Sequence, residues 1–431
     1  MIIYLLLIIL FIFYIVIVIK RAKKYKYNTQ KGYIYNLEKN FVKTAVLDDN
    51  GFEFTKNDYD TIFVKIELSF SFISYFFKPF IKIENQKHYF EYGAKGIRYL
   101  NISHTQRDNI KFDLHHLRLK NKALSIYAYK NSINFEKDSL LILAPHADDA
   151  EIAGFGFYKS MKNVTIVTTT IGEHGNCNYC DIYNDEDKAS LKKAELRTID
   201  ALSTGLYGGV TIQNSIALGY FGGSLKWMKE HQDKNASSLK KILKDMNLFR
   251  RVSHSNINLA DKVSPNYNSF LNDLVSIIEQ KKPNIILTPH PIIDSHPDHK
   301  YTSFALKDAL KTTKHSCKIL SYTNHLSISE SYPVGDLHSS ISLPPNFKEF
   351  DFTSIYSFGL SEDLQIDKFF ALESIHDLRN SSIQISIKKA YKQLDRLISR
   401  KIKGKDKSYY KRAVRANELF FVIGSKNISC R

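Results

Sequence analysis

The chain has 431 residues, of which 43% are hydrophobic and 13% aromatic, with only 18 glycines and 10 prolines. This composition supports more than one packed core and excludes a disordered or collagen-like protein. The formal net charge is +17, from 61 Lys and Arg against 44 Asp and Glu. The sequence has no zinc-finger, helix-turn-helix or RNA-binding aromatic signature, so we expect no nucleic-acid partner.

Residues 1–19 form an apolar run that contains no charge and no proline. Four basic residues follow it at once: Lys20, Arg21, Lys23 and Lys24. A cleaved signal peptide would carry its positive charge before the run and a small-residue cleavage site after it. Because basic residues stay on the cytoplasmic side, residues 1–24 are predicted to be an uncleaved transmembrane helix with a basic flank. This predicts a single-pass protein of the cell inner (cytoplasmic) membrane, with its catalytic domain in the cytoplasm. The alternative is a buried core helix.

Residues 25–136 contain short runs rich in Phe, Tyr, Ile and Val, such as TIFVKIELSFSF and ALSIYAYK. Their alternation and polar interruptions predict an antiparallel, β-sandwich-like accessory domain. Such a domain can bind carbohydrate or act as a spacer, and fold alone does not decide between the two.

Residues 137–330 alternate between strand and helix patterns. Strand signals cover 140–144, 164–170, 210–213, 284–288 and 318–322, and helical patterns cover 150–161, 185–203 and 267–281. This alternation predicts an α/β catalytic core built on a doubly wound, Rossmann-like parallel sheet. No G-x-G-x-x-G follows the first strand, so we expect no dinucleotide site. The long connection over 219–256 is predicted to be a substrate-facing lid.

Metal-competent side chains follow two of these strands. The segments LLILAPHADDAE and TPHPIIDSHPDH carry His146, Asp148, Asp149, His296, Asp298 and His299. Ligand crevices in open α/β sheets lie at the carboxyl ends of the strands, so the two segments should meet. Each segment alone is a weak motif, and their common strand context is what strengthens the prediction.

The chemistry of these residues indicates a hydrolase. His146, Asp149 and His299 supply the three protein ligands that a catalytic zinc ion usually takes, although other divalent metals suit the same donors. Asp148 is then a second carboxylate that can take a proton from water. His296, oriented by Asp298, can stabilise an oxyanion or protonate a leaving amine.

The two segments resemble the motifs Pro/Ala-His-Pro-Asp-Asp and His-Pro-Asp-His of the PIG-L/LmbE-like family of zinc-dependent N-acetylglucosaminyl deacetylases. The resemblance extends to VTIVTTTIGEHG and KKAELRTIDALSTGLYGGV and covers roughly residues 138–325. It implies Zn²⁺ on His146, Asp149 and His299, with Asp148 as general base. It also implies that His296 assists at the oxyanion or leaving group and that Asp298 orients it. Ala147 stands where the family motif has a proline. A proline at this position would only stiffen the turn.

The resemblance implies removal of acetate from an N-acetylated sugar on a lipid or another carrier. A membrane anchor and a basic surface would favour a glycolipid, lipopolysaccharide or polysaccharide precursor, although the positive charge can equally be a solvated surface. The alternative is a non-catalytic glycan-binding scaffold protein. The oligomeric state stays open.

Residues 331–431 are predicted to be a C-terminal extension with basic helices over 366–402 and a last strand over 418–422. The basic helices could touch a membrane or pack on the core. The chain has four cysteines: Cys177, Cys180, Cys317 and Cys430. A reducing cytoplasm predicts that their thiols are free.

Overall fold

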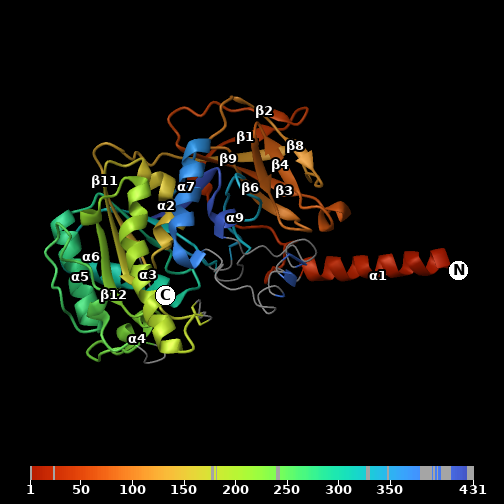
Figure 1. Cartoon of the computed structure of the whole chain (residues 1–431). Coiled ribbons are helices and arrows are strands. Elements are labelled where there is room, and N and C mark those ends of the chain that lie inside the picture. Colours follow the sequence, from red (N-terminus) through yellow and green to blue (C-terminus); the bar gives the residue numbers. More distant parts are fainter. Residues whose placement is uncertain are drawn as a thin grey trace. The chain divides into compact units, whose positions relative to one another are not determined.

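The computed structural model describes residues 2–22, 25–175, 179–180, 182–238, 243–326, 331–346, 349–378, 391, 394–395, 397–398 and 409–424. The chain divides into two compact units, whose elements are labelled in Figure 1. Unit 1 comprises Met1–Lys130, Ile328–Phe347 and Ile385–Asn417, and unit 2 comprises Asn131–Ser327, Lys348–Gln384 and Glu418–Arg431. The predicted C-terminal extension is therefore divided between the two units, and most of its predicted basic helical region lies outside the described residues.

The N-terminal helix α1 spans Ile2–Ala22. Its side chains are described from Ile3 to Val18, and most of them are exposed. Within the residues that the structure describes, no helix is long and apolar enough to cross a membrane. This finding contradicts the predicted transmembrane helix and the predicted single-pass location in the inner membrane.

Unit 1 is built around antiparallel sheets. Its elements are β1 (Phe41–Val46), β2 (Gly51–Glu53), β3 (Thr61–Leu68), β4 (Phe80–Ile83), β5 (Gln86–Tyr89), β6 (Gly96–Asn101), β7 (Asn109–Lys111), β8 (Asp113–His115), β9 (Ala123–Tyr129) and the short helix α9 (Tyr409–Ala413). The strands form sheets in the orders β1-β9-β3-β6, β5-β4-β8 and β2-β7, and every pair is antiparallel. The antiparallel pairing of the β-rich region is therefore confirmed. Buried Ile, Val, Leu and Phe side chains from these strands form one core.

Unit 2 contains a seven-stranded sheet in the order β12-β11-β10-β13-β14-β16-β15. Its strands are β10 (Ser139–Ala144), β11 (Asn163–Thr170), β12 (Ser215–Tyr220), β13 (Ile285–Pro289), β14 (Lys318–Tyr322), β15 (Ser354–Gly359) and β16 (Asn417–Ile423). Strands β10 to β14 pair in parallel, as predicted, and β16 is antiparallel to β14. The strand predicted at 210–213 begins later, at Ser215, because a 3₁₀ turn occupies Ile212–Asn214.

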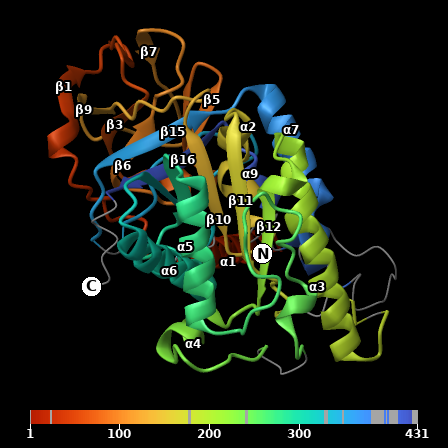
Figure 2. The ribbon, with the colours of Figure 1, turned by 90° about the vertical axis from the view of Figure 1, so that its left-hand side faces the viewer.

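Helices cover both faces of this sheet (Figure 2). They are α2 (Asp149–Lys159), α3 (Glu186–Ser203), α4 (Leu225–Glu230), α5 (Tyr267–Lys281), α6 (Pro297–Thr313) and α7 (Glu362–Ser374). Side chains of α5 and α6 pack into the core on one face, and those of α2 and α7 into the core on the other. The doubly wound arrangement follows from strands that are apolar on both faces.

Within the connection over 219–256, residues 246–252 pack in the core and do not form a lid. Met246, Phe249 and Val252 are buried in the core beside β12. The Arg250 guanidinium is buried and donates to both carboxylate oxygens of Asp273, at 2.7 and 2.9 Å. Loop length alone predicted a lid, but these apolar and paired side chains hold the segment against the sheet.

Helix α2 is interrupted at Gly154, whose φ of −149° and ψ of 32° are not helical. A Cβ atom at this position would lie 2.9 Å from Cδ2 of Leu287 on β13. The glycine therefore permits the helix to lie close against the sheet.

A buried ion pair makes hydrogen bonds to backbone N–H and carbonyl groups of α2 near this interruption. The Glu418 carboxylate accepts from the N–H groups of Gly156 and Phe157 at 2.9 and 2.8 Å. The Lys368 ammonium donates to the carbonyl oxygen of Ile152 at 3.0 Å and to Glu418 at 2.8 Å. Both charged side chains are only 1% exposed. The pair thus replaces hydrogen bonds that a continuous helix would make itself.

Replacing Lys368 by Met should leave the Glu418 carboxylate buried without a cation. We expect this change to lower the free energy of unfolding by about 3–5 kcal/mol, as for other broken buried pairs. Urea unfolding measures the loss. The matched control is Lys226→Met, which removes an exposed partner of Glu230 and should cost about 1 kcal/mol or less. Equal losses in the two variants would contradict a stabilising role for the buried pair.

Candidate active site

The predicted site residues stand at two helix N-termini in unit 2. His146 lies in the turn after β10, Asp148 is the N-cap of α2, and Asp149 begins that helix. After β13, His296 is the N-cap of α6, and Pro297 takes the first helical position. Proline suits this position because its missing N–H would have no helical partner. The two segments meet because β10 and β13 are parallel neighbours in the sheet.

Three side-chain atoms converge where the two segments meet. His146 Nδ1 and His299 Nε2 each lie 3.1 Å from Asp149 Oδ2, and the two nitrogens are 3.4 Å apart. All three residues are buried. In a tetrahedral site with metal-ligand distances of 2.0–2.1 Å, the ligand atoms lie roughly 3.3–3.4 Å from one another. The observed separations therefore fit a zinc-sized cation held by these three atoms.

In both His146 and His299, the ring nitrogen that points away from Asp149 faces another carboxylate. His146 Nε2 lies 3.3 Å from Asp298 Oδ2, and His299 Nδ1 lies 3.1 Å from Asp294 Oδ2. Such contacts fix the tautomer and the ring orientation of metal-binding histidines. They direct His146 Nδ1 and His299 Nε2 toward Asp149.

The electrostatics of this cluster favour positive charge. Burial lowers the pKa of His146, but its hydrogen bonds to Asp149 and Asp298 outweigh burial and raise it to about 9. Burial also lowers the pKa of His299, but Asp149 and Asp294 outweigh burial and hold this pKa well above the ordinary value. Despite burial, the pKa of Asp149 is well below its ordinary value because of the two histidines. The buried carboxylates thus stabilise a cation here, whether it is a proton or a metal ion.

Asp148 is held at the edge of this cluster by Arg197. The guanidinium Nη2 of Arg197 lies 3.3 Å from Asp148 Oδ1, and its Nη1 donates to Asp377. The carboxylate of Asp148 is more exposed than that of Asp149, at 13% against 2%. It therefore remains accessible to water beside the three converging atoms.

His296 also lies beside the cluster, and one of its nitrogens comes within 4.8 Å of ligand atoms of His146 and His299. Its Nδ1 accepts from the backbone N–H of Asp298 at 3.2 Å. Burial, together with the nearby His146 and His299, lowers the pKa of His296 to about 3. A neutral imidazole that accepts at Nδ1 carries its proton on Nε2. His296 is therefore a hydrogen-bond donor at Nε2.

Asp298 does not contact His296 in the way the sequence predicts. Its carboxylate contacts His146 and accepts from the N–H of Gly223 at 2.7 Å, and its backbone N–H donates to Nδ1 of His296. The prediction paired the two residues because they are neighbours in the chain. A carboxylate oxygen of Asp298 nevertheless lies within 4.8 Å of a ring nitrogen of His296, so the orienting role of Asp298 stays a prediction.

Sequence reasoning assigned no role to several residues around the cluster. They are Asp294, Asn324, Glu173, His174, Arg197, His325 and Asp377. Asn324 donates to Asp149 Oδ1 at 2.7 Å. Glu173 accepts from the N–H of Gly222 at 2.8 Å, and burial raises its pKa to about 7. Asp294 stands five residues before His299, close enough to be suspected as its partner, whereas no sequence signal points to Asn324 or Asp377.

The cysteine prediction is wrong for Cys180, which is disulfide-bonded. Cys177 and Cys430 lie outside the described residues, and Cys317 is free, as predicted. The expectation of free thiols rested on the predicted compartment and not on the local geometry.

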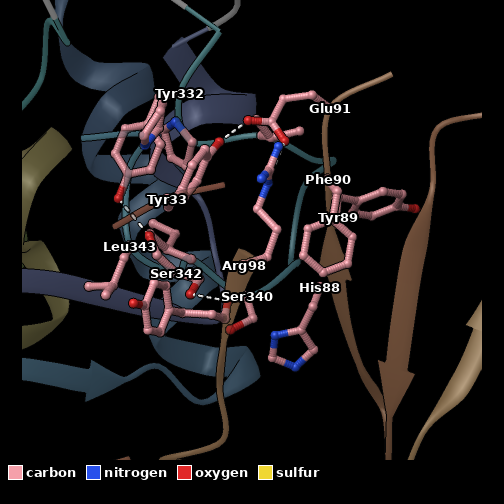
Figure 3. A pocket seen from close by; sticks show the side chains of 15 residues that line it. Tyr33, His88, Tyr89, Phe90, Glu91, Arg98, Tyr332, Ser340, Ser342 and Leu343 are labelled. Carbon is pink, nitrogen blue, oxygen red and sulfur yellow. Dashed lines mark hydrogen bonds and ion pairs between the residues drawn. The ribbon is translucent and has the colours of Figure 1, made fainter. Parts of the chain in front are cut away.

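A cavity of about 40 Å³ lies within unit 1 (Figure 3). The charged groups on its wall are paired: the Arg98 Nε lies 3.2 Å from Glu91, and Tyr33 also donates to Glu91. A cavity of this size can hold only a few water molecules, whereas ligand pockets usually enclose about 300–1,000 Å³. This cavity is therefore too small for a sugar ring, and carbohydrate binding by the β-rich region stays a prediction.

Several solved structures are similar to this chain. N,N'-diacetylchitobiose deacetylase from Pyrococcus horikoshii is 16% identical, and the match covers 67% of this chain and 85% of that chain, with a TM-score of 0.36. The zinc-inhibited form of teicoplanin deacetylase Orf2 is 16% identical, with coverages of 66% and 97% and a TM-score of 0.33. A 4-carboxy-2-hydroxymuconate hydratase from Pseudomonas putida is 13% identical, with coverages of 68% and 97% and a TM-score of 0.31. Likenesses this weak carry no argument about function.

Sequence comparison identifies one domain of this chain. No curated protein sequence matches this chain. Residues 141–310 match the family model described as PIG-L, GlcNAc-PI de-N-acetylase. This span contains all six predicted site residues, as the resemblance of their motifs predicted. The chain therefore carries a PIG-L domain.

Proposed function

We propose that this chain is a metal-dependent N-deacetylase that hydrolyses the acetamide of an N-acetylhexosamine. The observation that carries the proposal is the convergence of His146 Nδ1, Asp149 Oδ2 and His299 Nε2 within 3.1–3.4 Å. This convergence lies in a PIG-L domain, whose family description names a de-N-acetylase.

The three converging atoms would hold Zn²⁺ and leave room for water and the acetamide oxygen. When bound, zinc would polarise the acetamide carbonyl and make water more acidic. Asp294 and Asp298 would keep the two imidazoles in the tautomers that this requires.

Asp148 is the proposed general base. Its carboxylate takes a proton from the attacking water while the water oxygen forms a bond to the acetamide carbon. The carbon-nitrogen bond then breaks, and the proton passes from Asp148 to the departing nitrogen. The products are acetic acid, which releases its proton to become acetate, and a free amine. Arg197, shared between Asp148 and Asp377, holds the base in position.

His296 is the proposed oxyanion donor. Because its Nδ1 is occupied by the N–H of Asp298, its Nε2–H is free to donate to the acetamide oxygen as negative charge develops there. This geometry favours oxyanion stabilisation over proton delivery to the amine.

We further propose that the sugar is part of a phosphorylated carrier, such as a glycolipid or a lipopolysaccharide or polysaccharide precursor. The family description names a phosphatidylinositol-linked sugar, and the net charge of +17 complements an anionic carrier.

The metal assignment predicts the effect of removing each ligand. Replacing His146, Asp149 or His299 by Ala should reduce bound zinc to background and abolish acetate release, because three ligands leave no redundancy. Plasma mass spectrometry of the purified variants gives the metal content per chain. His315→Ala is the control, since the His315 ring contacts the backbone carbonyl of Pro283 and none of the proposed ligands. Retained metal in all three ligand variants would show that the site is wrongly assigned.

Asp148 and His296 should separate catalysis from metal binding. Asp148→Asn should keep the metal but lower the deacetylation rate by roughly 10²- to 10⁴-fold, the range for a lost general base. His296→Ala should keep the metal and lower kcat by roughly 10²- to 10³-fold, as for a lost oxyanion donor. Steady-state kinetics on metal-loaded protein measures both effects. An unchanged rate in Asp148→Asn would move the base role to another residue.

The substrate class can be tested with glycolipid and polysaccharide extracts. Incubation with zinc-loaded protein should remove acetyl groups from an amino sugar, seen by mass spectrometry, and should act faster on a phosphorylated carrier than on free N-acetylglucosamine. The Asp148→Asn protein is the control. Binding of glycan without acetate release would favour a glycan-binding scaffold instead.

A further inference from the structure

Asp294 is a fully buried carboxylate in the connection between β13 and α6. Its Oδ2 lies 3.1 Å from His299 Nδ1 and accepts from the backbone N–H groups of Asn324 and His325 at 3.2 and 3.3 Å. Its Oδ1 accepts from the backbone N–H of His296 at 2.9 Å. One carboxylate thus joins a proposed metal ligand to the two loops that follow β13 and β14.

We propose that Asp294 is the positioning residue that sets the metal affinity of the site, an inference that rests on the proposed function. By accepting the Nδ1 proton of His299, it leaves the Nε2 lone pair directed toward Asp149. Without this partner, the His299 ring could take the other tautomer or turn about its side-chain bonds.

Asp294 also acts on a second ligand through Asn324. Its Oδ2 accepts from the backbone N–H of Asn324, whose side-chain amide donates to Asp149 Oδ1 at 2.7 Å. This leaves Asp149 Oδ2 facing the two histidines. Asp294 therefore orients both His299 and Asp149, and it fixes the backbone of His296 as well.

The groups around Asp294 decide which substitution is informative. Every group that approaches its carboxylate is a donor: the His299 ring N–H, three backbone N–H groups and the hydroxyl of Thr323. An Asn side chain has the same shape but would place an NH₂ group against some of these donors. Asp294→Asn therefore removes acceptor capacity while it preserves volume.

Zinc affinity, measured by competition with a chromophoric chelator, tests the proposal. Asp294→Asn should weaken zinc binding by about 10- to 100-fold, the range for lost partners of metal-binding histidines. Urea unfolding of each protein separates this effect from general destabilisation. Asp273→Asn is the matched control: its carboxylate is also buried and bonded, to Arg250 and Tyr220, but it contacts none of the proposed ligands. It should lower stability without changing zinc affinity. Wild-type zinc affinity in Asp294→Asn, or an equal loss in Asp273→Asn, would overturn the proposal.

A second measurement needs no substitution and covers the case in which Asp294→Asn does not fold. In zinc-loaded wild-type protein labelled with ¹⁵N-histidine, His299 should show a protonated Nδ1 and a metal-bound Nε2. Coordination through Nδ1 would overturn the role of Asp294. A wild-type protein that binds no zinc would contradict the proposed function itself. A wild-type protein that binds zinc with an affinity insensitive to Asp294 would contradict only the role of Asp294.

Discussion

The candidate site depends on negative charge that is buried next to two imidazole rings. Asp149, Asp294 and Asp298 are almost inaccessible to water, and burying a carboxylate is costly unless a cation or hydrogen bonds compensate it. His146 and His299 each lie between two of these carboxylates. The arrangement is therefore stable only with positive charge at its centre, which is also the condition for holding a divalent metal. Parallel strands β10 and β13 bring these groups together, and the start of α6 supplies both Asp298 and His299.

The elements that the sequence predicted well are those whose pattern is local. Strands β10, β11, β13 and β14 are apolar runs, and α3 and α5 are periodic, so both types could be recognised without tertiary context. The proposed ligands could also be predicted, because each follows a strand end. The contacts between segments that are far apart in the chain could not be predicted from the sequence. Asn324 reaches Asp149 from a loop with no motif, Asp377 reaches Arg197 from the C-terminal region, and the Asp298 carboxylate contacts His146, a residue of the other segment.

Two failures came from reading length and composition without tertiary structure. The connection over 219–256 is long enough for a lid, but Arg250 and its apolar neighbours pack against the sheet. The apolar N-terminal run was predicted to cross a membrane, whereas no helix among the described residues has the required length and apolarity.

The interruption of α2 has a consequence for the order in which the protein can fold. Every proposed metal ligand is present once the chain has been synthesised to residue 299, yet Glu418, which accepts from the N–H groups of Gly156 and Phe157, follows much later in the chain. Because domains tend to fold from the N-terminus during synthesis, the helix that begins with Asp149 would wait, with exposed amide groups, for the strand that completes the sheet. A nascent or truncated chain would thus contain every proposed ligand without the packed helix that positions two of the groups at the site. Completion of the proposed site should accordingly be a late event in folding, coupled to the arrival of the C-terminal strand.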